Sequence, residues 1–167
     1  MHFTHAILSL AFAVAPLSAA PVEDAGVAQG PGLFARVEYV NCLPAKNQSP
    51  QKNGFKVSVD NAKNEAGVAK FQTKTKSGDP HRYQNTDKLN WGVSDCDDAN
   101  SELWEYPVFW EGANQKTWRI NDKTKNQDKT PIRVVYANNN GNVVYCGIMT
   151  HSEVDSNYQG KGYFQKC

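Results

Sequence analysis

Four polar side chains stand out as candidates for chemistry because of the residues that surround them. Glu105 lies in WEYPVFW, Arg133 in IRVVY and His151 in VVYCGIMTH, and all three runs are rich in the β-branched and aromatic residues typical of strands. His81 lies in the turn-rich stretch SGDPHRYQN. A charged residue within an apolar strand faces solvent, pairs with an opposite charge, or takes part in chemistry.

Together these four residues fit the cleavage of RNA through its own 2′-hydroxyl group. A base must take the 2′-OH proton and an acid must protonate the departing 5′-oxygen, and Glu105 and His151 suit these two roles. The guanidinium group of Arg133 suits the negative charge on the phosphoryl oxygens. His81 would hold the phosphate or the 2′-OH from the other side. This scheme needs no metal ion.

The alternative interpretation is structural: Glu105 and Arg133 form a cross-strand ion pair, and His151 caps a strand. Successive side chains of a strand point to opposite faces, so each run divides its residues between two faces. This alternation groups Glu105 with Pro107 and Phe109, groups His151 with Tyr145, Gly147 and Met149, and sets Arg133 opposite Ile132 and Val134. Pro107 also indicates a strand edge or a local irregularity, which often borders a site.

The elements that must position these residues are one helix and several strands. Residues 60–71, DNAKNEAGVAKF, offer an N-cap and a weak apolar stripe, which predicts a single helix. Residues 138–142, NNNGN, are typical of a hairpin turn, and KGYFQKC predicts a short final strand. One helix followed by hairpin-linked strands predicts an α+β fold with an antiparallel sheet. The expected helical stripe consists of Ala62, Ala66, Val68 and Ala69.

The N-terminal segment predicts export. The run from Ala6 to Ala20 is apolar, carries no charge and ends in small residues, as a secretory signal does, and it is short for a membrane span. We therefore expect a signal peptide in residues 1–20, a pro-segment in residues 21–36 and one folded domain in residues 37–167. A buried N-terminal helix is the alternative for the first of these segments.

Four cysteines remain in the expected domain: Cys42, Cys96, Cys146 and Cys167. An even number of cysteines in a small exported chain indicates two disulfides, and the residues alone permit three pairings. The chain has no C-x-x-C pair, which argues against a zinc site.

The net charge of +1 is small but unevenly distributed. Residues 42–78 hold seven lysines, residues 89–115 hold six acidic residues and no basic one, and residues 116–133 hold six basic residues. Basic segments can follow a phosphate backbone. They are equally the composition of ordinary solvated loops.

The motifs, taken in order, resemble a known family. PHRYQN, EYPVF, RVVY and CGIMTH resemble the guanyl-specific fungal ribonuclease superfamily, and SDCD and the cysteine placement resemble its toxic branch, the ribotoxins. The longer runs SGDPHRY, LWEYPV, TPIRVVYAN, YCGIMTHSEVD and QGKGYFQKC are most similar to the small hirsutellin-type ribotoxins of insect-pathogenic fungi. The resemblance covers residues 37–167.

The resemblance implies a five-stranded antiparallel sheet packed on one helix, an N-terminal β-hairpin, long structured loops, and the disulfides Cys42–Cys167 and Cys96–Cys146. It also implies a secreted monomer without a cofactor that acts in the cytosol of target cells. Its target would be one phosphodiester bond in the sarcin–ricin loop of large-subunit ribosomal RNA. Partners would be the ribosome and, during cell entry, acidic membrane lipids. Because ribotoxins are usually strongly basic, the charge of +1 is a departure that concerns these attractions.

The resemblance places the family's catalytic residues on His81, Glu105, Arg133 and His151, the set already selected on chemical grounds. Asp79 stands where the broader family usually has a tyrosine, and hirsutellin-type members have aspartate there. Phe164 matches an aromatic residue that lines the site in that group, although packing beside Cys167 explains it nearly as well. Tyr106, like Trp104, Trp110 and Trp118, is assigned mainly to the core, with base stacking and substrate binding as the alternative.

Two rival functions use the same sequence features. One is a broad extracellular ribonuclease with a preference for guanine. The other is a non-catalytic effector that binds RNA or a host protein on a ribonuclease scaffold. The presence of all four candidate residues argues against the second.

Overall fold

A computed structural model describes residues 36–167 of the chain. The predicted signal peptide and nearly all of the predicted pro-segment lie outside the described residues. The elements follow the order β1 (Tyr39–Cys42), β2 (Lys46–Asn47), β3 (Phe55–Ser58), α1 (Val59–Ala69), β4 (His81–Arg82), α2 (Ser94–Asp97), β5 (Leu103–Pro107), η1 (Thr124–Asn126), β6 (Ile132–Asn139), β7 (Asn142–Val154) and β8 (Gly160–Lys166). None of the helices in this part of the chain is both long and apolar enough to span a bilayer.

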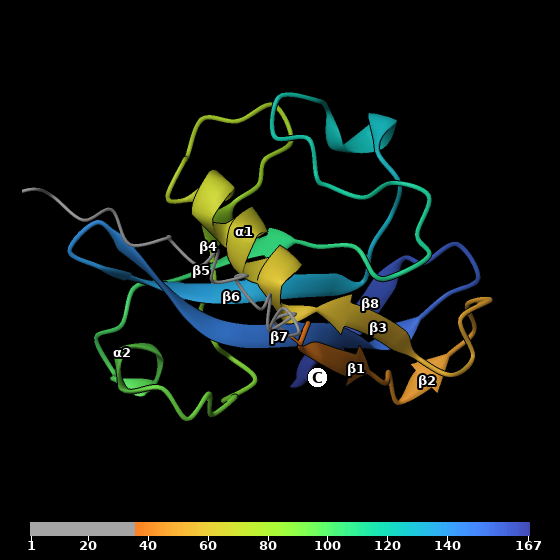
Figure 1. The fold of residues 1–167 in the computed structure, drawn as a ribbon, viewed down its shortest axis with the longest axis horizontal. Helices are drawn as coiled ribbons and strands as arrows, with labels where there is room; N and C mark the ends of the chain where they lie inside the picture. The colour runs from red at the N-terminus through yellow and green to blue at the C-terminus, as the bar shows by residue number, and fades with distance from the viewer. Residues whose placement is uncertain (1–35) are drawn as a thin grey trace, which may run out of the picture. The chain divides into compact units, whose positions relative to one another are not determined.

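The fold is α+β, as predicted, with α1 lying across one face of the main sheet (Figure 1). The five expected antiparallel strands are β4 to β8, and β1 pairs with β3 as the expected N-terminal hairpin. The prediction of five strands misses a sixth, because the short β2 pairs in parallel with the end of β7. The prediction of a single helix misses α2, a four-residue turn of helix.

Helix α1 begins and ends close to the predicted limits, with two differences. Its N-cap is Ser58, whose hydroxyl accepts a hydrogen bond from the backbone N–H of Asn61 at 3.2 Å, so the cap is not in the predicted segment. Ala62 and Ala66 are fully buried against the sheet because alanine lets the helix approach closely. Val68 was predicted to share this stripe, but its side chain faces solvent and is 69% exposed.

The β6–β7 hairpin forms at the predicted turn and contains an irregularity that the sequence did not reveal. Asn140 and Gly141 both have positive φ, as a tight two-residue turn requires. Val135 pairs with Gly147, but its neighbour Tyr136 pairs with Tyr145, so β7 holds one extra residue. This bulge places Tyr145 on the helix side of the sheet, and the predicted shared face of Tyr145 and His151 is therefore wrong.

Two apolar clusters cover the two faces of the sheet. The larger lies between the sheet and α1 and contains Tyr106 and Tyr136. The smaller lies on the opposite face, beneath the loop that carries Trp91 and α2. Long loops connect α1 to β4 and β5 to β6, as expected, and the second loop contains the short helical turn η1 (Figure 1).

The two disulfides join the pairs that the resemblance implied. Cys42–Cys167 connects β1 to the C-terminus across 125 positions of sequence, and Cys96–Cys146 ties α2 to β7 across 50. Within residues 36–167 no cysteine is free. The first bond holds the hairpin to the main sheet, and the second fixes the loop that covers the smaller cluster.

Candidate active site

The candidate catalytic residues lie on the face of the sheet opposite α1. Residues that pair directly across antiparallel strands point to the same face. His81 of β4 pairs with Glu105 of β5, and Pro107, two residues further along β5, pairs with Arg133 of β6. These strands therefore present His81, Glu105 and Arg133 on one surface.

The pairing of β6, β7 and β8 brings His151 and Phe164 to the same surface. Arg133 pairs with Met149 of β7, and His151 lies two residues further along this strand. His151 pairs in turn with Phe164 of β8. The four candidate residues and Phe164 thus come from five strands, although they are spread over 84 sequence positions between 81 and 164.

His81 is held between two carboxylates. Its Nδ1 atom lies 3.1 Å from Oδ1 of Asp79, and its Nε2 atom lies 2.6 Å from Oε1 of Glu105. Both carboxylates are buried, whereas His81 is exposed on one side. The hydrogen bond with Asp79 makes the largest contribution and that with Glu105 the next, and together they raise the pKa of His81 to about 9. The ring is therefore a cation at neutral pH.

Replacing Asp79 with asparagine should lower the pKa of His81 from about 9 toward its ordinary value of 6.5, because Asp79 makes the largest contribution to the rise. An NMR titration of the His81 ring protons measures this midpoint. Protonated His81 stabilises the fold fully below pH 6.5, and this stabilisation is lost as the pH rises through 9. The variant should lose it over a lower range, and its cleavage profile should shift. An unchanged His81 midpoint would leave Asp79 a turn residue only.

Arg133 is half-buried and anchored by its own loop. Its Nη1 atom donates to the backbone carbonyls of Thr130 at 2.9 Å and Ile132 at 3.0 Å. Burial lowers the pKa of Arg133, and the charges of Glu105 and Asp79 oppose this change. Among residues 36–167 its Nε–H has no partner, and no ion pair joins Arg133 to Glu105. The structural alternative of a cross-strand ion pair between these two residues is therefore wrong.

His151 is packed between an aromatic ring and a backbone segment. Its ring centroid lies 4.1 Å from that of Phe164, with 35° between the planes, and its Nδ1 atom lies 3.4 Å from the carbonyl oxygen of Gly162. Burial, followed by the nearby charge of Arg133, lowers the pKa of His151. The pKa of His81 is therefore raised, and the pKa of His151 lowered, from the same ordinary value of 6.5.

Gly160 is a positioning residue that the sequence reasoning missed. A Cβ atom at this position would overlap the imidazole ring of His151, so only glycine leaves the ring its present place. Gly160 is buried and begins β8, opposite Val154. The only sequence signal is the motif QGKGY, in which glycine lies within a strand and indicates a close approach.

Replacing Gly160 with alanine should lower kcat for RNA cleavage about tenfold to a hundredfold, because a displacement of the His151 ring by about 1 Å disrupts its alignment. The KM should change less, since the substrate-facing cations stay in place. A dinucleotide assay separates the two constants, and the ring resonances of His151 report its displacement. Gly67→Ala is the matched control, because a Cβ there meets nothing within 4 Å. An unchanged kcat in Gly160→Ala would contradict the positioning role.

The loop between β4 and β5 closes one side of this surface. Trp91 packs over Gly147, where a Cβ atom would come within 2.8 Å of the indole ring. Lys166 donates to the carbonyl oxygen of Asn90 at 2.8 Å, and the carboxylate of Asp87 accepts from the backbone N–H of Phe164 at 2.9 Å. The loop is thus tied to β8 beside the aromatic partner of His151.

Tyr106 is not brought to the site. It is 1% exposed, lies on the helix side of the sheet, and donates from its hydroxyl group to the carbonyl oxygen of Trp118 at 3.0 Å. The expectation that Tyr106 binds substrate is therefore wrong, and its assignment to the core is correct. Phe164, by contrast, lies on the surface with the catalytic candidates.

The arrangement of these side chains defines a class of protein. A buried carboxylate, two histidines with opposite pKa shifts and an arginine without an acidic partner share one face of an antiparallel sheet. This set can move protons on a substrate that carries its own nucleophile and can hold its anionic oxygens. In residues 36–167 no three His, Cys, Asp or Glu side chains are grouped as metal ligands. Such a set of side chains is suited to acid–base chemistry on phosphodiesters.

Comparison with known proteins agrees with this class. Residues 44–167 match the ribonuclease family. The solution structure of hirsutellin A from Hirsutella thompsonii is 49% identical, covers 77% of this chain and 98% of its own, and superposes with a TM-score of 0.66. Two further structures share the fold. Restrictocin, an Aspergillus ribotoxin, is 22% identical, covers 78% of this chain and 99% of its own, and has a TM-score of 0.57. The cytotoxic ribonuclease alpha-sarcin is 23% identical, covers 78% of this chain and 98% of its own, and has a TM-score of 0.54. No curated protein sequence gave a match.

The chain therefore belongs to the ribonuclease family, and within it to the hirsutellin-type ribotoxins.

Proposed function

We propose that the protein is a secreted ribotoxin that cleaves one phosphodiester bond in the sarcin–ricin loop of large-subunit ribosomal RNA and thereby stops protein synthesis. The observation that carries the proposal is the arrangement of Glu105, Arg133 and His151 on one face, with His81 held against Glu105 at 2.6 Å. The fold and family are those of ribotoxins. The reaction is a cyclisation followed by hydrolysis.

In the first step Glu105 acts as the general base. One of its oxygens is hydrogen-bonded to His81, and the other, Oε2, has no partner within residues 36–167. The carboxylate of Glu105 takes the proton of the ribose 2′-OH while the 2′-oxygen attacks phosphorus. Cationic His81 keeps Glu105 ionised and places a positive charge near the phosphate, and Arg133 stabilises the charge on the phosphoryl oxygens.

His151 acts as the general acid for the departing 5′-oxygen. Because its Nδ1 atom donates to the carbonyl oxygen of Gly162, Nε2 is the nitrogen that delivers the proton. The bond between phosphorus and the 5′-oxygen breaks, which leaves a 2′,3′-cyclic phosphate and a 5′-hydroxyl. Water opens the ring with the two roles reversed, and Phe164 holds the His151 ring during both steps.

Cleavage should be fastest at mildly acidic pH. The reaction needs Glu105 ionised and His151 protonated, and the protonated fraction of His151 is lost as the pH rises through its lowered pKa. The alkaline limb of kcat/KM should therefore have its midpoint below 6.5, the ordinary value for histidine. A rate profile from pH 4 to 9 on a dinucleotide gives this midpoint. A limb above pH 7 would assign the acid to another group.

Exposed cations on the loop between β5 and β6 supply a docking surface for the ribosome despite the low net charge. Their side chains are all exposed and can lie against phosphates or acidic lipid headgroups during cell entry. Arg119 is partly neutralised by Asp122 at 2.6 Å. Binding to ribosomes should therefore weaken with added salt. The residues of this surface are Lys116, Arg119, Lys123, Lys125 and Lys129.

Incubation of intact ribosomes with the mature protein tests the proposal. A ribotoxin releases one discrete 3′-terminal fragment of the large rRNA, and His151→Gln should abolish that fragment. A smear of fragments would instead favour the broad guanyl-preferring ribonuclease. Toxicity that persists in His151→Gln without any cleavage would favour the non-catalytic effector.

A further inference from the structure

A cavity of about 270 Å³ lies outside the face that carries the catalytic candidates. Four separate segments build it: the loop inside the N-terminal hairpin, the segment after β5, the end of the β5–β6 loop, and the turn between β7 and β8. It is lined by aromatic, amide and charged side chains, as small-molecule sites usually are. We propose that this cavity is an accessory site that binds one nucleotide of the RNA substrate, its base against the aromatic wall and its phosphate at Lys129.

The wall that would contact the base is formed by Trp110 and Tyr158. Their ring centroids lie 4.8 Å apart at an angle of 40°, so they form one continuous surface with no slot between them. Trp110 is fixed from behind by Phe55, whose centroid lies at 4.9 Å. A rigid aromatic surface of this kind stacks any base, because every base has a π-face.

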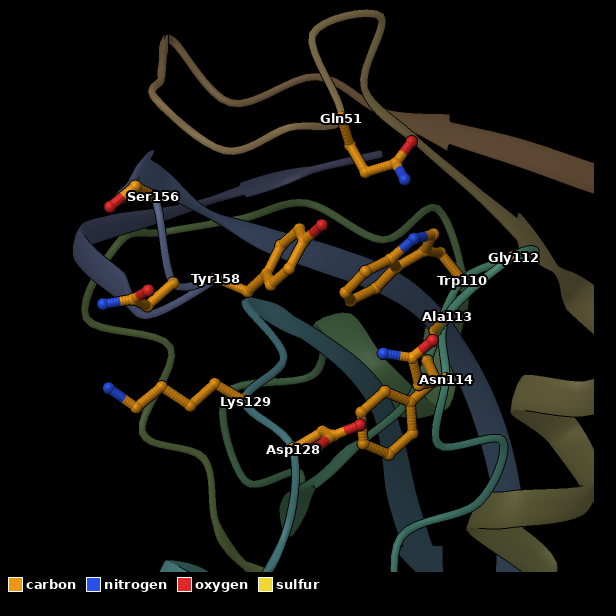
Figure 2. Close-up of a pocket in the computed structure, with 11 residues that line it drawn as sticks. Gln51, Trp110, Gly112, Ala113, Asn114, Asp128, Lys129, Ser156 and Tyr158 are labelled. Carbon is orange, nitrogen blue, oxygen red and sulfur yellow. The ribbon is translucent and has the colours of Figure 1, made fainter.

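The polar groups around this wall match the edge of a nucleotide. Figure 2 shows Gln51 on the side of the Trp110 indole nitrogen, and Asn114, Asp128 and Lys129 on the opposite side of the cavity. Amide groups can both donate to and accept from base edges, and a carboxylate, which only accepts, favours bases that carry N–H groups. The exposed ammonium group of Lys129 can hold the attached phosphate.

The indole nitrogen of Trp110 supplies an independent observation. Trp110 is only 6% exposed, and its Nε1–H has no hydrogen-bond partner within residues 36–167. A buried donor without a partner costs stability, and Trp91 and Trp118 have indole nitrogens in the same state within residues 36–167. Because Trp110 lines the cavity, its indole N–H resonance reports what enters the cavity.

The cavity shares two backbone segments with the catalytic face. Lys129 precedes Thr130, whose carbonyl oxygen anchors Arg133. Tyr158 lies two residues before Gly160, which fixes the ring of His151. The residues that contact a nucleotide bound here would therefore be near neighbours in sequence of Thr130 and Gly160, which position Arg133 and His151. Such a nucleotide would extend the RNA contact beyond the cleaved bond. In that respect the inference rests on the proposed function.

Binding of nucleoside 5′-monophosphates to the whole mature protein tests the site without any cleavage assay. In an ¹⁵N-labelled sample, the indole N–H resonance of Trp110, assigned with Trp110→Phe, should shift and saturate with a dissociation constant on the order of 1 mM. Purine nucleotides should bind more tightly than uridine monophosphate. The resonance of Trp91 reports binding at the catalytic face separately.

Variants sharpen this test. Tyr158→Ala should weaken binding roughly tenfold or more by removing stacking, and Lys129→Ala should weaken it only at low salt. Lys125→Ala is the matched control, because this exposed lysine of the same loop does not line the cavity. The Lys125→Ala variant should therefore bind nucleotides as tightly as the original protein. If Tyr158→Ala fails to fold, Asn114→Ala takes its place, since it replaces an exposed residue that lines the cavity and should also weaken nucleotide binding.

The outcomes separate the two proposals. A Trp110 resonance that stays unmoved at 10-fold the expected dissociation constant, or that moves equally in all variants, overturns the accessory site. With the site present and the function correct, Tyr158→Ala, which removes no charge from the docking surface, should reduce cleavage of ribosomes by a factor similar to its loss of nucleotide binding. If ribosomes give no discrete fragment while Trp110 still responds to nucleotides, the ribotoxin proposal fails and the nucleotide site stands.

Discussion

Replacing Glu105 with glutamine should lower the rate of RNA cleavage about 10²- to 10⁴-fold, the range that a general base contributes. Glutamine keeps the shape of the side chain but cannot take the 2′-OH proton. It also removes a charge that raises the pKa of His81, so this histidine should titrate below its present value of about 9. Single-turnover cleavage of a short RNA at the optimal pH measures the loss.

The matched control for this variant is Glu102→Gln. Glu102 pairs with Arg82 at 3.0 Å beside the same two strands, but its carboxylate is 37% exposed and lies away from His81. Its removal should leave the cleavage rate within about twofold of the original, since exposed ion pairs contribute little. The melting temperature of Glu105→Gln should fall slightly, because the variant loses part of the interaction that stabilises protonated His81. A loss of less than tenfold in Glu105→Gln would assign the base to another residue.

Replacing both Cys42 and Cys167 with alanine should reduce the free energy of unfolding by about 5 kcal/mol, the value that loop entropy gives for a separation of 125 positions. The bond connects the hairpin to the C-terminus, and Cys42 is fully buried in the main cluster. Denaturant unfolding at pH 6 measures the change. The catalytic face does not contain this bond, so the folded variant should keep its cleavage rate at low temperature.

The second disulfide provides a comparison of a different kind. Removing Cys96 and Cys146 should cost about 4 kcal/mol for a separation of 50 positions. This bond ties α2, in the same loop as Trp91, to β7, so its loss should also lower the cleavage rate. A loss of stability below about 1 kcal/mol in both variants would show that the tertiary contacts alone hold these segments.

Much of the fold could be predicted because its signals are local. Alternating β-branched and aromatic residues indicate β5, β6 and β7, and NNNGN supplies the positive φ values of the β6–β7 turn. Helix α1 follows from its alanine spacing. Strand β4 is only two residues long, and its sequence has no strand signal of its own, so it exists because it pairs with β5.

The sequence predicts which residues belong to the candidate site, but not how they are arranged. Charged residues within apolar strands identify Glu105 and Arg133, but the sequence left open an ion pair between them that is absent from residues 36–167. Glu105 is paired with His81 instead, because the register of two distant segments places them opposite each other. The extra residue in β7 likewise moved Tyr145 to the other face, and no local pattern indicates a bulge there.

Residue types and their local spacing specify which side chains are available for chemistry, the α+β class, and the order of the strands that carry the site. These properties depend on residue type and on a period of two, which neighbouring residues specify. The position of His81 between Asp79 and Glu105, the room that Gly160 leaves for His151, and the cavity lined by Trp110, Tyr158 and Lys129 all depend on how the strands and loops pack. The His81–Glu105 contact and the cavity join segments far apart in the chain, and their distances are set by packing of the whole domain rather than by local preference.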